Sequence, residues 1–266
     1  MPDRPDYLIV EENLRTAMRF FGQAREQGAL QEAPGVSLIF SGIDYSVFNS
    51  ALLSTPVHAD VTDLKNRIAT AASHFGPRGF RWSFWLCEDM LDRSIRRQAR
   101  NTFAAGRLWP FTDPPGMLAE RLAPVSRPLP DIEYRRVTDA VTRLTFAHIT
   151  CIGFEIPYMV ARQVYELERA WSGDYVGWIG YANGVPVATA ATVVAAGAVG
   201  VYSVATLPAW RRRGYAEALL RRVLGDIRAR TGIERTVLQS SKAGLSLYEK
   251  MGYRMVTRFI VYLSEP

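Results

Sequence analysis

A short segment, residues 207–220, joins three consecutive arginines, a glycine and a small alanine at a point where a strand should be followed by a helix. Gly214 permits a tight turn and a close approach of the backbone to a ligand, and Ala216 keeps side chains out of the way. The first residues of a new helix present unpaired N–H groups and the positive end of the helix dipole. This combination predicts an anion-binding turn that suits a pyrophosphate.

The positive charge of the chain is concentrated near this turn. The chain has 266 residues and a net charge of +6. Residues 1–130 carry 15 basic and 14 acidic side chains, whereas residues 131–266 carry 17 and 12, and residues 211–235 alone hold eight arginines and three acidic residues. A phosphate-bearing ligand needs such local charge. A solvated helix face and a nucleic-acid surface are the alternatives, but no helix-turn-helix or aromatic-basic pattern accompanies the arginines.

A second segment, residues 239–253, runs from a strand end through a helix, and with it the sequence resembles the GNAT superfamily of N-acetyltransferases. Arg211, Gly214 and Ala216 match the family's phosphate loop, which reads Arg/Gln-x-x-Gly-x-Gly/Ala. The family's later helix commonly reads Asn-x-Ala-x-x-x-x-Tyr-Glu-x-x-Gly-Phe. The similar residues here are Ser241, Ala243, Tyr248, Glu249, Gly252 and Tyr253. Ser241 therefore stands where the family usually has asparagine.

The resemblance covers residues 131–263 and implies acetyl-CoA as co-substrate, with no metal. It implies the GNAT fold, an α/β fold with a mixed α+β arrangement, in which helices flank a mostly antiparallel sheet. This sheet should splay open between its fourth and fifth strands, residues 199–207 and 236–239. Backbone groups around Val204 and Thr206 would pair with the pantetheine arm. The residues implied at the pyrophosphate and its surroundings are Arg211, Arg212, Arg213, Gly214, Tyr215, Ala216 and Ser241.

Two residues are candidates for the proton transfers of the reaction. Tyr248 matches the family's general acid toward the CoA sulfur, although a helix aromatic beside Leu245 and Leu247 would otherwise be read as core packing. Glu155 is the candidate base, because residues 152–157 often border the acceptor site in similar proteins. Most loop glutamates are simply solvated.

The expected elements alternate between helix and strand in both halves of the chain. Before residue 123 the predicted helices are 11–27, 62–75 and 91–103, and the predicted strands are 36–41, 47–53, 81–86 and 108–111. After residue 130 the predicted strands are 132–137, 175–181, 185–194, 199–207, 236–239 and 254–263, and the predicted helices are 139–148, one after Pro157, 215–230 and 243–251. Asn183 and Gly184 predict the tight turn of a hairpin.

Three prolines within residues 123–130 predict a linker between two domains, residues 1–122 and 131–266. The first half lacks the phosphate loop, yet residues 79–85 and 115–117 resemble the degenerate first domain of tandem GNAT proteins. It is expected to shape the acceptor pocket or to support the catalytic domain. The family usually ends in two paired strands, but one is predicted here, so its partner should come from the first half or from another subunit.

These observations predict an N-acetyltransferase that acts on a primary amine of a small molecule or peptide by direct attack on the thioester. A non-catalytic acyl-CoA-binding regulatory module is the alternative. Cys87 and Cys151 form no C-x-x-C pair, so neither a disulfide nor a zinc site is expected. Residues 1–6 lack an apolar signal core, so we expect a cytoplasmic protein without membrane attachment. No nucleic-acid partner is expected, and a homodimer is left open.

Overall fold

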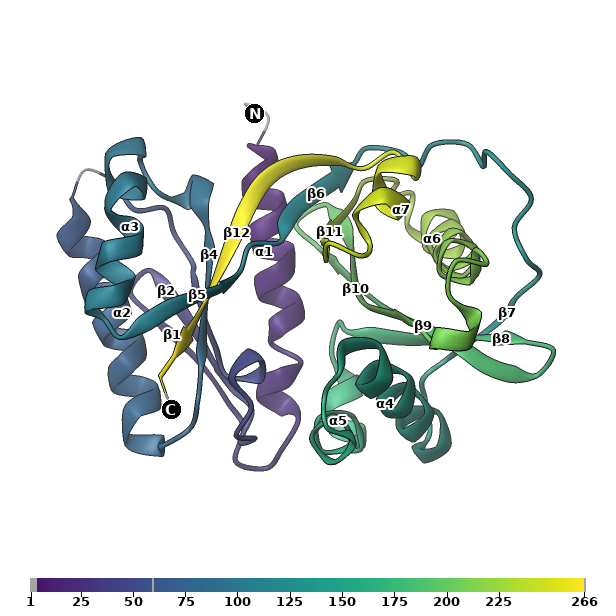
Figure 1. Ribbon diagram of the computed structural model, residues 1–266, viewed down its shortest axis with the longest axis horizontal. Helices are drawn as coiled ribbons and strands as arrows, with labels where there is room; N and C mark the ends of the chain where they lie inside the picture. The colour runs from purple at the N-terminus through teal and green to yellow at the C-terminus, as the bar shows by residue number, and fades with distance from the viewer. Residues whose placement is uncertain (1–3, 59, 266) are drawn as a thin grey trace.

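The computed structural model describes residues 4–58 and 60–265 and places two sheet-and-helix halves on either side of the helix α1 (Asp6–Met18) (Figure 1). Their strands form one sheet in the order β1-β2-β3-β4-β12-β6-β11-β10-β9-β8-β7, and β5 also pairs with β12. Neighbouring strands are antiparallel except in the pairs β3–β4 and β10–β11. The predicted mixed α+β fold with a mostly antiparallel sheet is confirmed.

The first half is a sheet with helices on both faces. Its strands are β1 (Ala29–Ala33), β2 (Val36–Phe40), β3 (Ser50–Leu53), β4 (Ser83–Cys87) and β5 (Leu108–Thr112), and its other helices are α2 (Val61–Phe75) and α3 (Arg93–Ala105). α2 and α3 cover the outer face, whereas α1 lies on the inner face toward the second half (Figure 1). The apolar side chains of all three helices join the strands in one buried core.

The second half repeats this arrangement. Its strands are β7 (Glu133–Arg136), β8 (Val176–Ala182), β9 (Val185–Ala195), β10 (Ala198–Thr206) and β11 (Thr236–Gln239), and its helices are α4 (Ala140–Phe154), α5 (Tyr158–Tyr165), α6 (Tyr215–Thr231) and α7 (Leu245–Lys250). α4 and α5 pack on one face of the sheet, and α6 and α7 pack on the other. We call these the α4/α5 face and the α6/α7 face. α1 contacts β9, β10 and β11 on the α4/α5 face.

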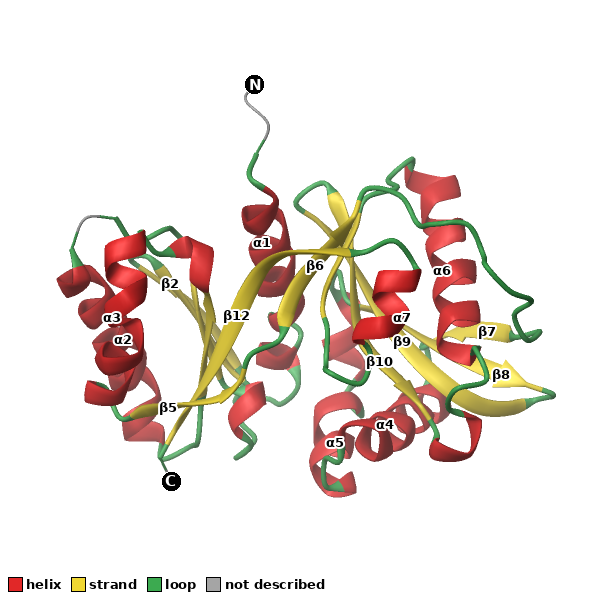
Figure 2. Ribbon diagram, turned by 45° about the horizontal axis from the view of Figure 1, so that its top comes forward, coloured by secondary structure: helices red, strands yellow, loops and turns green. Residues whose placement is uncertain are grey.

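The two halves exchange strands. β6 (Pro115–Ala119) leaves the first half and pairs with β11 of the second. β12 (Arg254–Ser264) pairs through residues 254–258 with β6, and its residues 259–264 continue into the first half between β4 and β5. Figure 2 shows β12 crossing from one half to the other. The expected partner of the last strand therefore comes from the first half of the same chain.

Several predicted elements have other bounds in the structure. The helix predicted at residues 11–27 is α1, which begins at Asp6 and ends at Met18, because Phe20 then stacks on Tyr175 at 4.3 Å and Phe21 meets Phe48 at 4.8 Å. The helix predicted at 139–148 continues to residue 154, and α7 is shorter than predicted. In the segment predicted as a strand at 47–53, residues 46–48 form a 3₁₀ turn.

Two strands escaped prediction for different reasons. β1 alternates weakly and lies at the sheet edge, where half-exposed side chains give little periodicity. β6 begins at Pro115, in a Pro-Pro-Gly sequence that normally interrupts structure. Proline lacks an N–H donor but is tolerated as the first residue of a strand. Tertiary pairing with β11 and β12 thus overrides the local signal.

Two local predictions in the second half are confirmed. Asn183 and Gly184 have φ of 51° and 77°, the left-handed pair that a two-residue hairpin turn requires. Asp139 caps α4 by accepting a hydrogen bond from the Thr142 N–H at 2.8 Å. Residues 120–132 hold neither helix nor strand. The division into a domain of residues 1–122, a linker of 123–130 and a domain of 131–266 stays a proposal.

Candidate active site

The sheet of the second half opens between β10 and β11. These parallel strands pair only at Val199 with Thr236 and at Gly200 with Val237. Beyond this fork β10 continues for six residues without pairing with β11. The predicted splay between the fourth and fifth strands of this half is therefore present.

A bulge in β10 lies at the start of the opening. The pairing of β10 with β9 shifts between Tyr202 and Ala205, and Ser203 adopts a φ of 46°. The Ser203 hydroxyl lies 2.6 Å from the Tyr175 hydroxyl, and the Ser203 carbonyl accepts a hydrogen bond from Thr189 at 2.9 Å. The unusual backbone conformation is thus held by Thr189 of the neighbouring strand β9 and by Tyr175, which directly precedes β8.

The bulge determines which backbone groups face the opening. Leu207 donates its N–H to the Val187 carbonyl of β9 at 3.0 Å. Because backbone groups alternate in direction along a strand, those of Val204 and Thr206 face away from β9, toward the splay. The structure therefore brings the two residues predicted to pair with pantetheine to the open edge.

The turn after β10 has the conformation that its glycine predicts. Arg212 and Gly214 both have positive φ, 59° and 92°. Arg211 donates from Nε to the Thr206 carbonyl at 2.9 Å and so fastens the turn to the strand end, and the Arg213 guanidinium lies over the Trp210 ring at 5.7 Å. These arginine contacts shape the turn, and the three arginines remain exposed.

The N-terminus of α6 follows directly and has no side-chain cap. Ala218 is the residue whose N–H donates to the Gly214 carbonyl, at 2.9 Å. The N–H groups of Tyr215, Ala216 and Glu217 therefore precede the first intrahelical bond and have no acceptor within the helix. The predicted anion-binding residues are brought together here, beside the open edge of β10.

One basic residue at this turn escaped the sequence prediction. A Cβ placed on Gly214 would lie 3.1 Å from the Arg127 guanidinium nitrogens and 3.0 Å from Pro130 Cδ. Arg127 also lies 3.6 Å from the carboxylate of Glu217, which is buried and bonded to Arg221 at 2.9 Å. The proline-rich connection thus runs over the turn. An arginine in a linker gives no sequence signal of this position.

Tyr248 lies on the α6/α7 face, in the same buried cluster as Val201 and Leu238 of the two splayed strands. It packs edge-on against Tyr253 with ring centroids 5.6 Å apart. Burial, with a smaller contribution from Tyr253, raises the pKa of Tyr248 well above its usual value. The phenol keeps its proton at neutral pH, as an unshifted tyrosine also would, and burial makes it a weaker acid.

The two remaining predicted residues are exposed. Ser241 precedes α7, and its hydroxyl accepts a hydrogen bond from the Gly244 N–H at 3.2 Å, which uses one of its lone pairs within the turn. Glu155 follows the last residue of α4 as its C-cap and has a φ of 55°. Two residues earlier, a Cβ on Gly153 would lie 2.5 Å from Ala205 Cβ, so the end of α4 abuts β10 just beyond the bulge. Glu155 thus borders the α4/α5 face and lies outside the buried part of the site.

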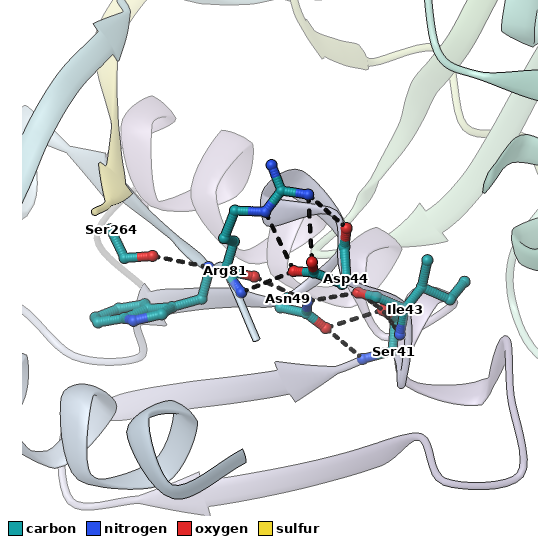
Figure 3. Close-up of polar contacts among 7 residues, drawn as sticks. Ser41, Ile43, Asp44, Asn49, Arg81 and Ser264 are labelled. Carbon is teal, nitrogen blue, oxygen red and sulfur yellow. Dashed lines mark hydrogen bonds and ion pairs between the residues drawn. The ribbon is translucent and has the colours of Figure 1, made fainter. Parts of the chain in front are cut away.

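A hydrogen-bonded loop of the first half packs against this face. The Asn49 amide donates to the carbonyls of Ile43 and Arg81 at 2.8 and 2.9 Å and accepts from the N–H and hydroxyl of Ser41 (Figure 3). Asp44 and Arg81 form an ion pair beside it. The network holds Ile43 and Phe48 in the apolar cluster of α4 and α5. No sequence motif marks these residues.

Two features are absent from the described part of the chain, residues 4–58 and 60–265. No three His, Cys, Asp or Glu side chains there are grouped so that they could hold a metal ion. None of its helices is long and apolar enough to cross a membrane.

Comparisons with known proteins agree with this geometry. Residues 173–255 match the acetyltransferase (GNAT) domain family. A GCN5-related N-acetyltransferase from Kribbella flavida is similar in structure, with a TM-score of 0.73, 17% identity and coverage of 99% of this chain and 97% of that one. A GCN5-related N-acetyltransferase from Sphaerobacter thermophilus gives a TM-score of 0.59 and 16% identity, covering 98% and 92%. No curated protein matches the sequence.

The structural matches run over nearly the whole chain, whereas the sequence match lies in the second half. The matched residues 173–255 include β10, the glycine turn, α6 and β11. The C-terminal half of the chain therefore contains an acetyltransferase (GNAT) domain over residues 173–255, and the full-length fold is similar to those of the two GNAT structures.

Proposed function

We propose that this protein transfers the acetyl group of acetyl-CoA to a primary amine by direct attack of the amine on the thioester. The observation that carries the proposal is the open edge of β10 leading straight to the uncapped N-terminus of α6. An extended chain with an anionic end matches this combination of strand edge and anion site.

In this proposal, different residues bind the pantetheine arm and the pyrophosphate of acetyl-CoA. The backbone of Val204 and Thr206 would bind the pantetheine arm, and the N–H groups from Arg212 to Ala216 would bind the pyrophosphate. Arg211, Arg213 and Ser241 would give secondary contacts, because part of their hydrogen-bonding capacity already holds the turns. No metal is needed for this chemistry, since acetyl-CoA is itself the activated donor.

The reaction joins the amine nitrogen to the acetyl carbon and breaks the carbon–sulfur bond. Tyr248 would donate its phenolic proton to the departing thiolate, and Glu155 would accept the proton that the amine loses. Tyr248 lies on the α6/α7 face, whereas Glu155 lies on the α4/α5 face. The two proton transfers would therefore take place on opposite sides of the sheet opening.

The alternative is an acyl-CoA-binding regulatory module, which would bind the cofactor without turnover. Both functions need the same turn, so binding alone does not separate them. The two cysteines are free and buried, in agreement with a protein of the reducing cytoplasm.

The first experiment is calorimetric titration with acetyl-CoA of the wild type and Gly214→Glu. A glutamate would place a carboxylate at the anion site and a Cβ about 3 Å from Arg127 and Pro130. We expect the Kd to rise at least about 100-fold, which corresponds to about 3 kcal/mol. Gly184→Glu is the matched control, because Gly184 also has a positive φ, 77°, but has open space around it. No binding by the wild type would overturn the proposal.

The second experiment measures thiol release with a panel of amines. Turnover with any amine excludes the regulatory module. Tyr248→Phe should lower kcat about 100-fold, whereas Tyr253→Phe, which alters the neighbouring buried phenol and restores the family's usual residue, should leave it nearly unchanged. Glu155→Gln should remove the rise of rate with pH that a glutamate base produces. An unchanged pH profile would exclude that role.

A further inference from the structure

Gln239, the last residue of β11, has a buried amide without a hydrogen-bond partner. Within the described residues, neither its Nε2 nor its Oε1 has a partner, and both atoms are inaccessible to solvent. Buried side-chain amides are nearly always hydrogen-bonded, because each unpaired group loses its hydration without replacement. An amide left in this state next to a substrate opening points to recognition of a ligand.

The amide lies on the α4/α5 face of the opening. Gln239 pairs with Gly116 of β6, and directly opposed residues of antiparallel strands project to the same face. A Cβ on Gly116 would meet Val10 of α1 at 3.1 Å. Since α1 covers the α4/α5 face, Gln239 faces this helix. Leu238, its neighbour in β11, packs on the opposite face with α6 and α7.

Across the opening, the position that matches Gln239 is Tyr202. Both lie two residues beyond the last pair of the fork, Gly200 with Val237. Tyr202 does not reach across: its ring folds back over Gly200, whose missing Cβ would lie 2.7 Å from the phenol oxygen. The phenol donates to Asn13 Oδ1 at 2.7 Å. The Tyr202 phenol is thus engaged with Asn13 and does not pair with the Gln239 amide.

Asn13, on the same face, is a side-chain amide with a structural role and serves as a comparison for Gln239. Its Nδ2 donates to the carbonyls of Ala195 and Ala198 at 2.8 and 3.1 Å, and its Oδ1 accepts from Tyr202. The two amides lie on one face of one fork. Asn13 is fully hydrogen-bonded and fixes α1 to the sheet, whereas the donor and the acceptor of the Gln239 amide are both unpaired.

We propose that the Gln239 amide recognises the acceptor substrate, an amine that carries a neutral hydroxyl or amide group close to its amino group. The inference rests on the proposed acetyl transfer. The turn that would hold the pyrophosphate precedes α6, and Tyr248 lies on the α6/α7 face. The acceptor therefore approaches the thioester from the α4/α5 face, where Gln239 lies. A side chain that can both donate and accept suits a neutral polar group better than a second charge.

The test compares two amines with the same apolar part, leucinamide and 3-methylbutylamine, in steady-state kinetics with acetyl-CoA. The wild type should favour leucinamide in kcat/KM at least about tenfold, because an alkylamine leaves the buried amide unpaired. Gln239→Leu should lose this preference, mainly through KM for leucinamide, while KM for acetyl-CoA stays within about twofold. Thr236→Val, on the same strand but the opposite face, should keep the preference.

Other results would overturn the proposal in recognisable ways. An unchanged preference in Gln239→Leu, an equal loss for both amines, or a rise in KM for acetyl-CoA each excludes acceptor recognition. The melting temperature of Gln239→Leu should not fall, since no hydrogen bond is removed, and a fall of several degrees would assign the amide a structural role. Absence of turnover by the wild type with every amine, despite acetyl-CoA binding, would overturn acetyl transfer together with this inference.

Discussion

The two halves of the molecule contain the same junction with opposite chemistry. In each, a parallel strand pair is followed by a helix, β3 by α2 and β10 by α6. In the first half, the buried Arg67 guanidinium donates to the carbonyls of Gly35, Thr55 and Pro56 at 3.1, 2.5 and 3.2 Å. In the second half, the turn at Gly214 presents backbone N–H groups at a helix end without a side-chain cap.

The helix termini differ in the same direction. Asp60 caps α2 by accepting from the Thr62 N–H at 2.8 Å, and Asp63 in its first turn pairs with Arg67 at 2.7 Å. Two carboxylates therefore occupy the end where a phosphate would bind. The fold therefore supplies the same junction twice, and under the proposed function the residues of each turn decide whether it binds an anion or only stabilises the chain.

The largest predicted effect concerns the closed junction. Arg67→Ala should lower the free energy of unfolding by about 4 kcal/mol, because it leaves three carbonyls and Asp63 without their buried partner. Denaturant unfolding measures this loss, and Arg19→Ala, which breaks an exposed ion pair with Glu32, should cost less than about 1 kcal/mol. Calorimetry of the folded variant should still give one acetyl-CoA per chain. Binding of a second acetyl-CoA would show that the junction of the first half can also bind an anion, and would contradict the difference between the two halves.

A second prediction concerns α1, through which the first half contacts the candidate site. Glu11 on this helix is buried, and burial raises its pKa to about 7, against the opposing effect of Arg15; Glu12 and Arg4 are the other charges that act on it. A raised pKa in the folded state means that stability is full below the unfolded value near 4.5 and is lost as the pH rises through about 7.

The expected loss is about 3 kcal/mol between pH 4.5 and pH 8. Urea unfolding across this range should show the fall in the wild type and a flatter profile in Glu11→Gln. Glu12→Gln, its more exposed neighbour, should behave as the wild type. Acetyl-CoA affinity at pH 8 should be alike in all three proteins, because α1 lies on the face away from α6. An acetyl-CoA affinity that changed together with the stability would show that α1 also affects the cofactor site of the second half.

The smallest predicted effect belongs to the connection between the halves. Arg127→Gln should raise the Kd for acetyl-CoA about fivefold, about 1 kcal/mol, because it removes one exposed positive charge beside Gly214. Arg222→Gln is the control, since Arg222 lies further along α6 and pairs with Asp131 at 3.5 Å. Equal effects of both substitutions would indicate general charge attraction and no specific role of the linker.

The sequence predicted those parts of the molecule that local chemistry determines. The glycine turn, the hairpin at Asn183 and the capped start of α4 each need particular residues at fixed spacing, so these residues could be read directly. The splay was expected through the family resemblance and is present. The roles of Tyr248, Glu155 and Ser241 stay predictions.

The missed features depend on contacts between distant segments. β6 is defined by its neighbours β11 and β12, and its own prolines argue against a strand. Arg127 reaches the turn because the connection wraps over α6, and Gln239 stands out only once its lack of partners is known. No local sequence pattern around these positions carries that information, since the energy that places them comes from tertiary pairing and burial.

The strand exchange also affects the order in which the protein can fold during synthesis. The sheet of the first half lacks the strand between β4 and β5 until residues 259–264 have been made. At roughly 5–20 residues per second, the ribosome needs roughly 7–30 s to add the residues that separate β5 from this strand. The first half must wait with an open sheet edge until then, and residues 254–264 complete the sheets of both halves almost together.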